Sequence, residues 1–156
     1  MEIAWRSNIS DRRNIKMFVD IKNELDNPIV RKLVNESAGD KSTEAMDRKA
    51  AEFRCNENWH LYGWIENGKI LGVCGCVIYS DYVEIYNIAV DPNNRKSGIG
   101  KAMINAAQEK YNMTLKAETD DGAVEFYRKC GFETEAFMKT YNTGVYQRYK
   151  CVLHTV

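Results

Sequence analysis

The chain has 156 residues, of which 44% are hydrophobic and 28% are charged, a balance typical of a globular domain with a sizeable core. Lysine plus arginine equals aspartate plus glutamate at 22 each, so no net charge attracts nucleic acid or an anionic membrane surface. No apolar run is long enough to span a membrane and no signal peptide is visible, so we expect a cytoplasmic protein with neither nucleic acid nor membrane as a partner.

The first 58 residues have the pattern of helices. Apolar residues repeat at helical spacing in three groups, Ile15 to Leu25, Ile29 to Val34 and Met46 to Phe53. The first predicted helix begins near residue 11. Asn27 followed by Pro28 predicts the cap and the first residue of the second helix.

From residue 59 the pattern changes to strands. His60–Ile65, Ile70–Tyr79 and Tyr82–Val90 are rich in β-branched and aromatic residues, as strands are. Asn67-Gly68 between the first two predicts a tight hairpin turn. The three segments therefore predict an antiparallel meander.

The last of these strands carries a break in its alternation. Val83 and Ile85 are apolar at odd positions, whereas Ile88 and Val90 are apolar at even ones. Successive side chains of a strand point to opposite faces, so the switch requires one extra residue. The sequence predicts a β-bulge at position 86 or 87.

A glycine-containing loop follows this strand. Asp91-Pro92 ends the strand, and a helix is predicted over 99–111. Between them, Gly98 and Gly100 let a ligand approach unpaired backbone N–H groups, and Arg95, Lys96 and Lys101 add positive charge, which favours a phosphate or pyrophosphate site. The structural alternative is a tight turn with solvated basic residues. Neither the P-loop spacing nor the third glycine of a dinucleotide fingerprint is present.

The remaining elements complete a mixed sheet with helices. The sequence predicts a strand over 114–118, a helix over 122–130 and a closing hairpin of strands 132–141 and 145–154. We expect one domain over 1–156, with a helical region over 1–58 and the sheet over 59–156.

The five cysteines are expected to be reduced core residues of a cytoplasmic protein. Cys74 and Cys76 lie two residues apart, so alternation places both on one face of a strand. A C-x-C pair without a second pair lacks the spacing of a zinc site, and we expect no metal.

Two motifs carry a family resemblance. R-x-x-G-x-G after A-V-D-P, at residues 89–100, resembles the acyl-CoA-binding signature of the GCN5-related N-acetyltransferases (GNAT). A second segment, Asp120 to Phe132, resembles the family's later motif through Ala123, Tyr127 and Gly131. Asp120 stands where the family usually has asparagine. The matched segments extend from about residue 60 to the C-terminus.

The resemblance implies a fold and a co-substrate. The fold is an α/β (α+β) domain, with a single mixed, largely antiparallel sheet flanked by helices, whose central parallel strand pair is splayed. The co-substrate is acetyl-CoA, and no metal is implied. The resemblance implies a cofactor-binding set of Ile88, Ala89, Val90, Arg95, Lys96, Ser97, Gly98, Ile99, Gly100, Lys101, Asp120, Ala123 and Tyr127.

Two side chains are the leading catalytic candidates. Glu84 precedes the predicted bulge, matches the base position of one branch of the family, and stands among apolar residues that would raise its pKa. The alternative is a solvent-facing strand glutamate. Tyr127 is the leading general acid toward the departing thiolate, with a packed helix aromatic as the alternative.

The predicted function is therefore N-acetyl transfer from acetyl-CoA to a primary amine of a small molecule or peptide, by direct attack in a ternary complex. Two alternatives stay open, an acyl-CoA sensor without turnover and an unrelated nucleotide-binding domain. The sequence leaves the oligomeric state open, with a homodimer as one option, and it does not name the acceptor.

Overall fold

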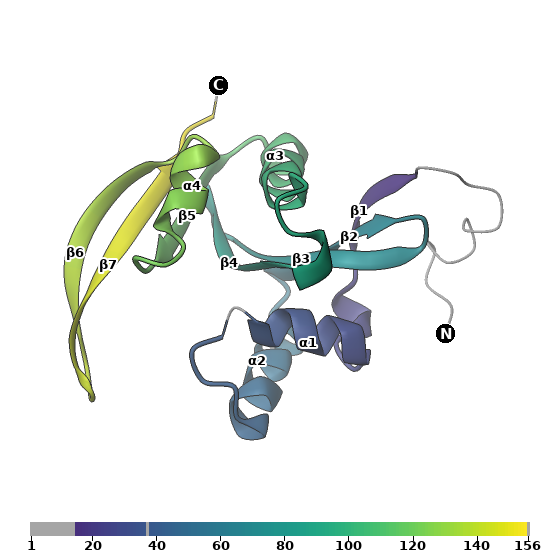
Figure 1. The fold of residues 1–156 in the computed structure, drawn as a ribbon, viewed down its shortest axis with the longest axis horizontal. Helices are drawn as coiled ribbons and strands as arrows, with labels where there is room; N and C mark the ends of the chain where they lie inside the picture. Colours follow the sequence, from purple (N-terminus) through teal and green to yellow (C-terminus); the bar gives the residue numbers. More distant parts are fainter. Residues whose placement is uncertain (1–14, 37, 156) are drawn as a thin grey trace.

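The computed structural model describes residues 15–36 and 38–155, and a seven-stranded sheet in the order β1-β2-β3-β4-β5-β7-β6 runs through them (Figure 1). Every neighbouring pair is antiparallel except β4 and β5, which are parallel. The strands are β1 (Lys16–Asp20), β2 (Trp59–Glu66), β3 (Lys69–Ile78), β4 (Tyr82–Val90), β5 (Thr114–Thr119), β6 (Glu133–Tyr141) and β7 (Gly144–Leu153). The helices are α1 (Pro28–Glu36), α2 (Thr43–Cys55), α3 (Ile99–Tyr111) and α4 (Val124–Lys129). The predicted mixed, largely antiparallel sheet is confirmed.

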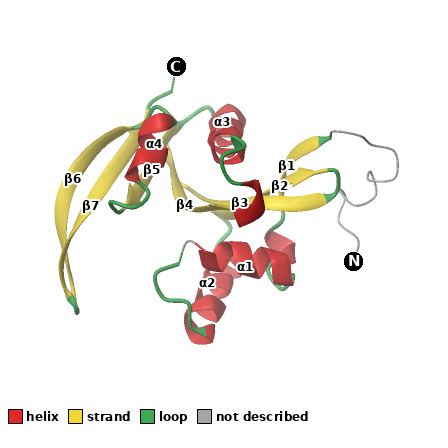
Figure 2. Cartoon of the chain, viewed as in Figure 1, coloured by secondary structure: helices red, strands yellow, loops and turns green. Residues whose placement is uncertain are grey.

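The helices cover the two faces of the sheet separately. Figure 2 shows α3 and α4 above the sheet and α1 and α2 below it. One apolar cluster joins α3 and α4 to the sheet through Met103, Ile104 and Tyr127, and a second joins α1 and α2 through Leu33 and Phe53. The α3–α4 face and the α1–α2 face are used below as the names of these two sides.

The first predicted helix is wrong. Residues 16–20 form β1, which pairs with β2 at the edge of the sheet, and the predicted start near residue 11 lies outside the described residues. Phe18 and Val19 are good strand residues, and Phe18 stacks on Tyr62 of β2 at 4.7 Å between ring centroids. Pairing with β2 therefore overrides a helical spacing that only four apolar residues supported.

The other N-terminal helices form as predicted. Asn27 accepts a hydrogen bond from the backbone N–H of Ile29 at 2.9 Å, and Pro28 is the first residue of α1. Met46, Ala50 and Phe53 are the buried residues of α2. The predicted helical region therefore consists of one strand followed by two helices.

The hairpin and the bulge also form where the sequence places them. Asn67 and Gly68 both have positive φ, 52° and 82°, as a two-residue turn between β2 and β3 requires. In the β3–β4 ladder, Gly75 pairs with Asn87 and Cys76 pairs with Ile85, so Tyr86 has no partner. Tyr86 is the extra residue, and the predicted bulge is confirmed.

The parallel strands separate soon after they meet. β4 and β5 pair only through Tyr82–Thr114, Val83–Leu115 and Glu84–Lys116. Beyond Glu84 each strand continues without the other, β5 pairing with β7 instead. The splayed pair that the family resemblance implies is present.

The prediction that all five cysteines are core residues is wrong at one position. Cys74, Cys76 and Cys151 are buried, and Cys130 is partly buried, whereas Cys55 is exposed at the end of α2. Cys74 and Cys76 share a face, with their Sγ atoms 3.9 Å apart. Within the described residues, no helix is long and apolar enough to cross a membrane.

Candidate functional site

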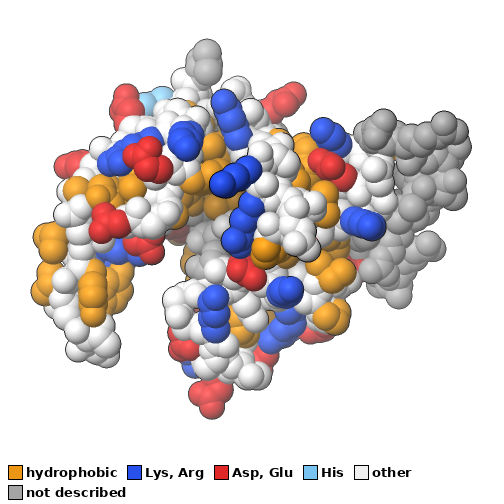
Figure 3. Space-filling model, in the orientation of Figure 1, with side chains coloured by type: hydrophobic (Ala, Val, Ile, Leu, Met, Phe, Trp, Pro, Cys, Tyr) orange, Lys and Arg blue, Asp and Glu red, His pale blue; other side chains and the backbone are white. Residues whose placement is uncertain are grey.

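The opening between β4 and β5 is the centre of the candidate site. On the space-filling view, an open notch separates the β6–β7 hairpin from α1 and α2 (Figure 3). Because β4 stops pairing with β5 after Glu84, the opening begins beside this glutamate and the bulge. The bulge changes which residues of β4 face each side. Val83, Ile85, Ile88 and Val90 pack toward the α3–α4 face, and Glu84, Tyr86 and Asn87 lie toward the α1–α2 face.

The start of α3 offers unpaired backbone donors. Gly98 precedes the helix with φ of 84°, and no side chain caps it. The first intrahelical bond runs from the N–H of Ala102 to the carbonyl of Gly98, which leaves the N–H groups of Ile99, Gly100 and Lys101 pointing out of the helix. A Cβ on Gly98 would meet no atom within 4 Å, so the approach to these donors is open. The geometry suits an anion such as a pyrophosphate.

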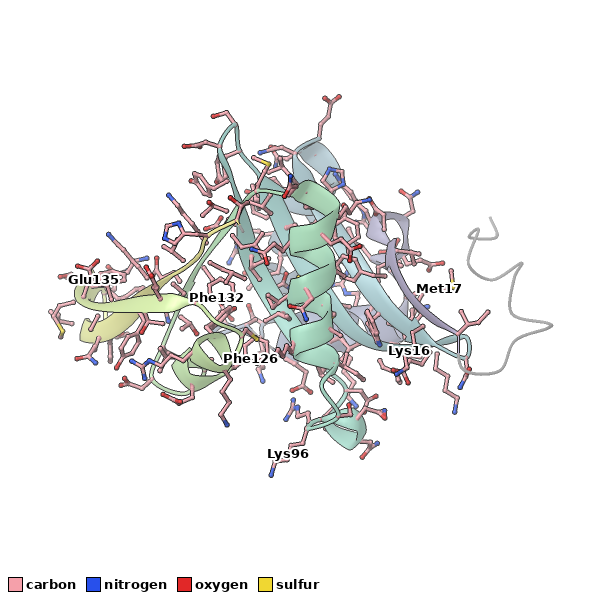
Figure 4. All side chains as sticks on the ribbon, turned by 90° about the horizontal axis from the view of Figure 1, so that it is seen from above. Lys16, Met17, Lys96, Phe126, Phe132 and Glu135 are labelled. Carbon is pink, nitrogen blue, oxygen red and sulfur yellow. The ribbon has the colours of Figure 1, made fainter. Side chains whose placement is uncertain are left out.

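The basic residues of the loop are used differently. Arg95 is bound to α1, with its Nη2 3.3 Å from Glu36 Oε2, and its Nε donates to the carbonyl of Val90 at 3.3 Å. Lys96 and Lys101 are exposed and form no ion pair with the described residues. Figure 4 shows Lys96 extending outward from the loop before α3. Two of the three predicted cations are thus free to meet a phosphate.

Gly100 serves a packing role that the sequence did not reveal. A Cβ at this position would lie 2.6 Å from Cε1 of Phe126, on α4. The ring of Phe126 therefore sits against the first turn of α3, and only glycine fits beneath it. Ser97, which follows Lys96, donates its hydroxyl hydrogen to the carbonyl of Asn94 and so stabilises the loop.

Asp120 caps α4. Its Oδ1 accepts from the backbone N–H groups of Gly122 at 3.0 Å and Ala123 at 3.2 Å, and its carbonyl accepts from Val124. Ala123 is the residue before the helix. The carboxylate thus performs a local task that an asparagine Oδ1 also performs.

Tyr127 is 5% exposed on the α3–α4 face. Its ring meets Phe126 and Phe132 edge to face, with centroids 5.2 Å apart in both pairs. Its hydroxyl makes no hydrogen bond to another described residue. Burial, with smaller contributions from nearby cysteines, raises the pKa of this phenol, so the proton stays on oxygen at neutral pH.

Glu84 is half-buried on the α1–α2 face. Burial raises the pKa of its carboxyl, and the charge of Glu118 on β5 raises it further. Glu118 itself stays ionised: burial raises its pKa, but hydrogen bonds from Lys139 and Arg148 outweigh this and lower it. Glu84 and Tyr127 therefore lie on opposite faces of the sheet, with the opening between β4 and β5 as the route from one side to the other.

Four further residues around the bulge belong to the candidate site and were not predicted to. The Tyr86 ring lies 4.7 Å from the Trp59 ring and 6.1 Å from the Phe53 ring, between centroids, and Lys49 Nζ lies 5.5 Å above the Tyr86 ring. These residues come from α2, β2 and β4, so no local sequence pattern joins them. The bulge is the only signal that pointed to Tyr86.

Asn87 is an unusual neighbour of the bulge. It is 5% exposed, and neither Oδ1 nor Nδ2 has a hydrogen-bond partner in the described part of the chain. Its carboxamide fills the space left by the absent side chain of Gly75, where a Cβ would lie 2.0 Å from Oδ1. A larger residue at position 75 would displace Asn87 and, with it, the bulge.

A half-open pocket of about 540 Å³ lies elsewhere, between α1, the β2–β3 turn and the end of β4. Its lining includes Leu33, Glu36, Lys69, Asp91 and Pro92, and none of the predicted catalytic or cofactor-binding residues. The candidate site is an open face rather than this cavity. Among residues 15–36 and 38–155, no cluster of three His, Cys, Asp or Glu side chains is arranged to hold a metal ion.

Comparison with known proteins identifies the family. A model described as the acetyltransferase (GNAT) domain matches residues 57–134. An "uncharacterized N-acetyltransferase in lysA 3'region" of Bacillus methanolicus is 30% identical over 92 residues, which are 58% of this chain and 76% of that protein. A GNAT-family acetyltransferase structure from Desulfovibrio desulfuricans has a TM-score of 0.70 at 21% identity, covering 91% of this chain and 100% of its own. A GNAT-family structure from Elizabethkingia anophelis with acetyl-CoA bound has a TM-score of 0.64 at 18% identity, covering 91% and 99%.

Proposed function

The chain belongs to the GNAT family of acetyl-CoA-dependent N-acetyltransferases, and on that premise we propose that it transfers an acetyl group from acetyl-CoA to a primary amine that approaches from the α1–α2 face. The observation that carries this proposal is the opening beside the bulge, which has a buried phenol on one face and a half-buried carboxylate on the other.

The residues around α3 suit the CoA end of the co-substrate. The N–H groups of Ile99, Gly100 and Lys101 would bind the pyrophosphate, with Lys96 and Lys101 neutralising its charge. The main chain of Ile88 to Val90, which pairs with β3 but not with β5, would line the arm that leads into the opening. Acetyl-CoA supplies an acyl group already activated as a thioester.

Two proton transfers complete the reaction. Glu84 removes a proton from the attacking amine as the new C–N bond forms, directly or through one water. Tyr127 donates its phenolic proton to the sulfur as the C–S bond breaks, so the products are the amide and the free thiol. Glu84 then loses its proton to solvent and the Tyr127 phenolate regains one, which restores both groups. The raised pKa of Glu84 makes it a stronger base than an exposed carboxylate, and Tyr127 carries its proton at neutral pH.

The acceptor does not follow from the relatives. Similar folds belong to proteins named for an aminoglycoside, spermidine and an alanine of ribosomal protein S18, at 13%, 16% and 19% identity. Likeness at this level concerns the fold alone. We therefore expect a small-molecule or peptide amine and seek its class in the residues of the α1–α2 face.

The test measures thiol release from acetyl-CoA with a panel of amines, followed by mass spectrometry of the products. We expect thiol release that depends on the amine, and a product heavier by one acetyl group. Thermal stabilisation by acetyl-CoA but not by ATP or NAD would exclude the nucleotide-binding alternative. Stabilisation without thiol release across the panel would instead identify an acyl-CoA sensor.

A further inference from the structure

Lys49 of α2 is a half-buried lysine without an anionic partner. Its Nζ lies 5.5 Å from the centre of the Tyr86 ring, and no carboxylate of the described chain pairs with it. Its neighbours on the same helix are paired, since Asp47 binds Arg31 at 2.7 Å and Arg54 binds Asp26 at 2.8 Å. Buried lysines are nearly always paired, because desolvation penalises the charged form. Burial does lower the pKa of Lys49, and no neighbouring charge contributes to the shift.

A second charge of opposite sign, with no ion pair among the described residues, lies near Tyr86. Glu84 comes two residues earlier on β4 and shares the α1–α2 face with Lys49. The two do not pair with each other, although both charges carry a desolvation cost. Tyr86 and Trp59 form an aromatic wall beside Lys49, with their ring centroids 4.7 Å apart, and Tyr86 is 40% exposed.

We propose that the acceptor is an amine that also carries a carboxylate, an amino acid or a similar small zwitterion, with its amine at Glu84 and its carboxylate at Lys49. This inference rests on the proposed function and names its substrate class. A carboxylate at Lys49 gives the lysine the partner that it lacks, and an ammonium group arriving at Glu84 offsets the charge of that carboxylate. The apolar part of the acceptor packs on the Tyr86–Trp59 wall.

The same charges disfavour a polyamine. A second ammonium group placed beside Lys49 would meet a like charge, and like charges near one another in a partly desolvated site repel. Glu52, three residues further along α2, also acts on Tyr86 and offsets only part of this repulsion. A neutral amine would leave Lys49 unpaired and gain nothing from it. The arrangement therefore discriminates among amines by the group beyond the reacting nitrogen.

The experiment compares acceptors that differ only in that group. Phenylalanine, phenylalaninamide and phenethylamine share a skeleton, and rates are referred to the free-amine concentration because their amine pKa values differ. We expect kcat/KM for phenylalanine to exceed that of the other two by about tenfold or more, the effect of one charge-assisted contact. Aliphatic amino acids with their amides repeat the comparison with a smaller side chain.

Variants of Lys49 provide the second readout. Lys49→Met should raise KM for the amino acid about tenfold or more, leave its kcat within a few-fold, and leave both parameters unchanged for the amide. Lys49→Arg should restore most of the lost affinity, since it restores the charge. Arg48→Met removes the neighbouring exposed cation of the same helix and serves as the matched control, with kinetics like the unmodified chain.

The outcomes separate the inference from the function beneath it. Thiol release that is equal for the amino acid and its amide, or unaffected by Lys49→Met, would overturn the amino-acid proposal while the acetyltransferase stands. Preference for the carboxylate that disappears only in Lys49→Met would support it. Absence of thiol release with every amine would remove the proposed function itself, and the acceptor class with it.

Discussion

Replacing Glu84 by glutamine separates a catalytic base from a surface carboxylate. Glutamine keeps the shape of the side chain and removes only its ability to accept a proton. If Glu84 takes the amine proton, kcat should fall by roughly 10²–10⁴-fold, or about 3–5 kcal/mol of barrier. Acetyl-CoA affinity should not change, because the proposed pyrophosphate donors lie at the start of α3.

The pH profile gives a sharper form of this prediction. Burial and Glu118 both raise the pKa of Glu84. As pH decreases, activity should therefore begin to fall at a higher pH than it would for a base with the usual pKa of glutamate. Glu118→Gln removes the smaller of the two causes and also frees Lys139 and Arg148, so it should move this limb to lower pH without abolishing it. In Glu84→Gln the limb should disappear from the residual activity.

Stability should change in the opposite direction from activity. A carboxyl whose pKa is higher in the folded chain binds its proton more tightly there, so the free energy of unfolding falls as pH rises through that pKa. Glutamine escapes this loss, and Glu84→Gln should therefore melt at the same or a higher temperature than the unmodified chain at pH 8. Full activity in Glu84→Gln would refute the assignment of Glu84 as the base. So would a pH–activity profile of Glu84→Gln with the same acidic limb as the unmodified chain.

Three further substitutions test the remaining parts of the site. Gly100→Glu should abolish acetyl-CoA binding, as measured by calorimetry. In Gly100→Ala the new Cβ, 2.6 Å from the Phe126 ring, should weaken binding unless Phe126 is also replaced by alanine. Unchanged affinity in a folded Gly100→Glu variant would exclude this loop as the CoA site. Tyr127→Phe should cost little stability, because the hydroxyl has no partner among the described residues. It should lower turnover tenfold or more, with a smaller loss for acyl donors whose thiol leaves readily. Equal losses across donors would indicate a positioning role. Gly75→Ala should destabilise the fold by about 1–3 kcal/mol, because its Cβ would lie 2.0 Å from Asn87 Oδ1, and each kcal/mol should lower Tm by roughly 2–4 °C. Adding Asn87→Ala in the same chain should recover much of the lost stability. An unchanged Tm in Gly75→Ala would contradict this packing.

The sequence predicted best those features that a few adjacent residues determine. The dipeptide Asn67-Gly68 strongly favours a tight turn, and Pro28 after Asn27 strongly favours the start of a helix. The bulge follows from a change of alternation within one strand, which needs no knowledge of the partner strand. These predictions depend on local geometry, and the structure confirms them.

The predictions that failed depend on distant partners. The apolar residues from Ile15 to Leu25 recur at a spacing compatible with a helix, and only the presence of β2 beside residues 16–20 makes those residues a strand. Cys55 was assigned to the core by residue type, although its place at the end of α2 leaves it exposed. Lys49 and Trp59 gave no local signal, because their meeting with Tyr86 depends on where α2 crosses the sheet. Gly100 was predicted for its closeness to a phosphate, and its contact with Phe126 required α4 to be placed.

The bulge ties the two halves of the candidate site to one extra residue. If the same sequence formed β4 without a bulge, its residues would alternate regularly through Tyr86. Ile88 and Val90 would then turn from the α3–α4 face to the α1–α2 face. The apolar contacts that hold the end of β4 against α3 would then be lost, and with them the placing of the loop that carries Gly98. Because of the insertion, Glu84 and Tyr86 face the acceptor side while the following residues still face α3. The pairing of Asn87 with Gly75 fixes the position of this insertion, since only an absent side chain at 75 leaves room for the carboxamide. Buried polar atoms without partners reduce stability, so the Asn87–Gly75 pair is better explained by the geometry it imposes on the site than by its contribution to the core.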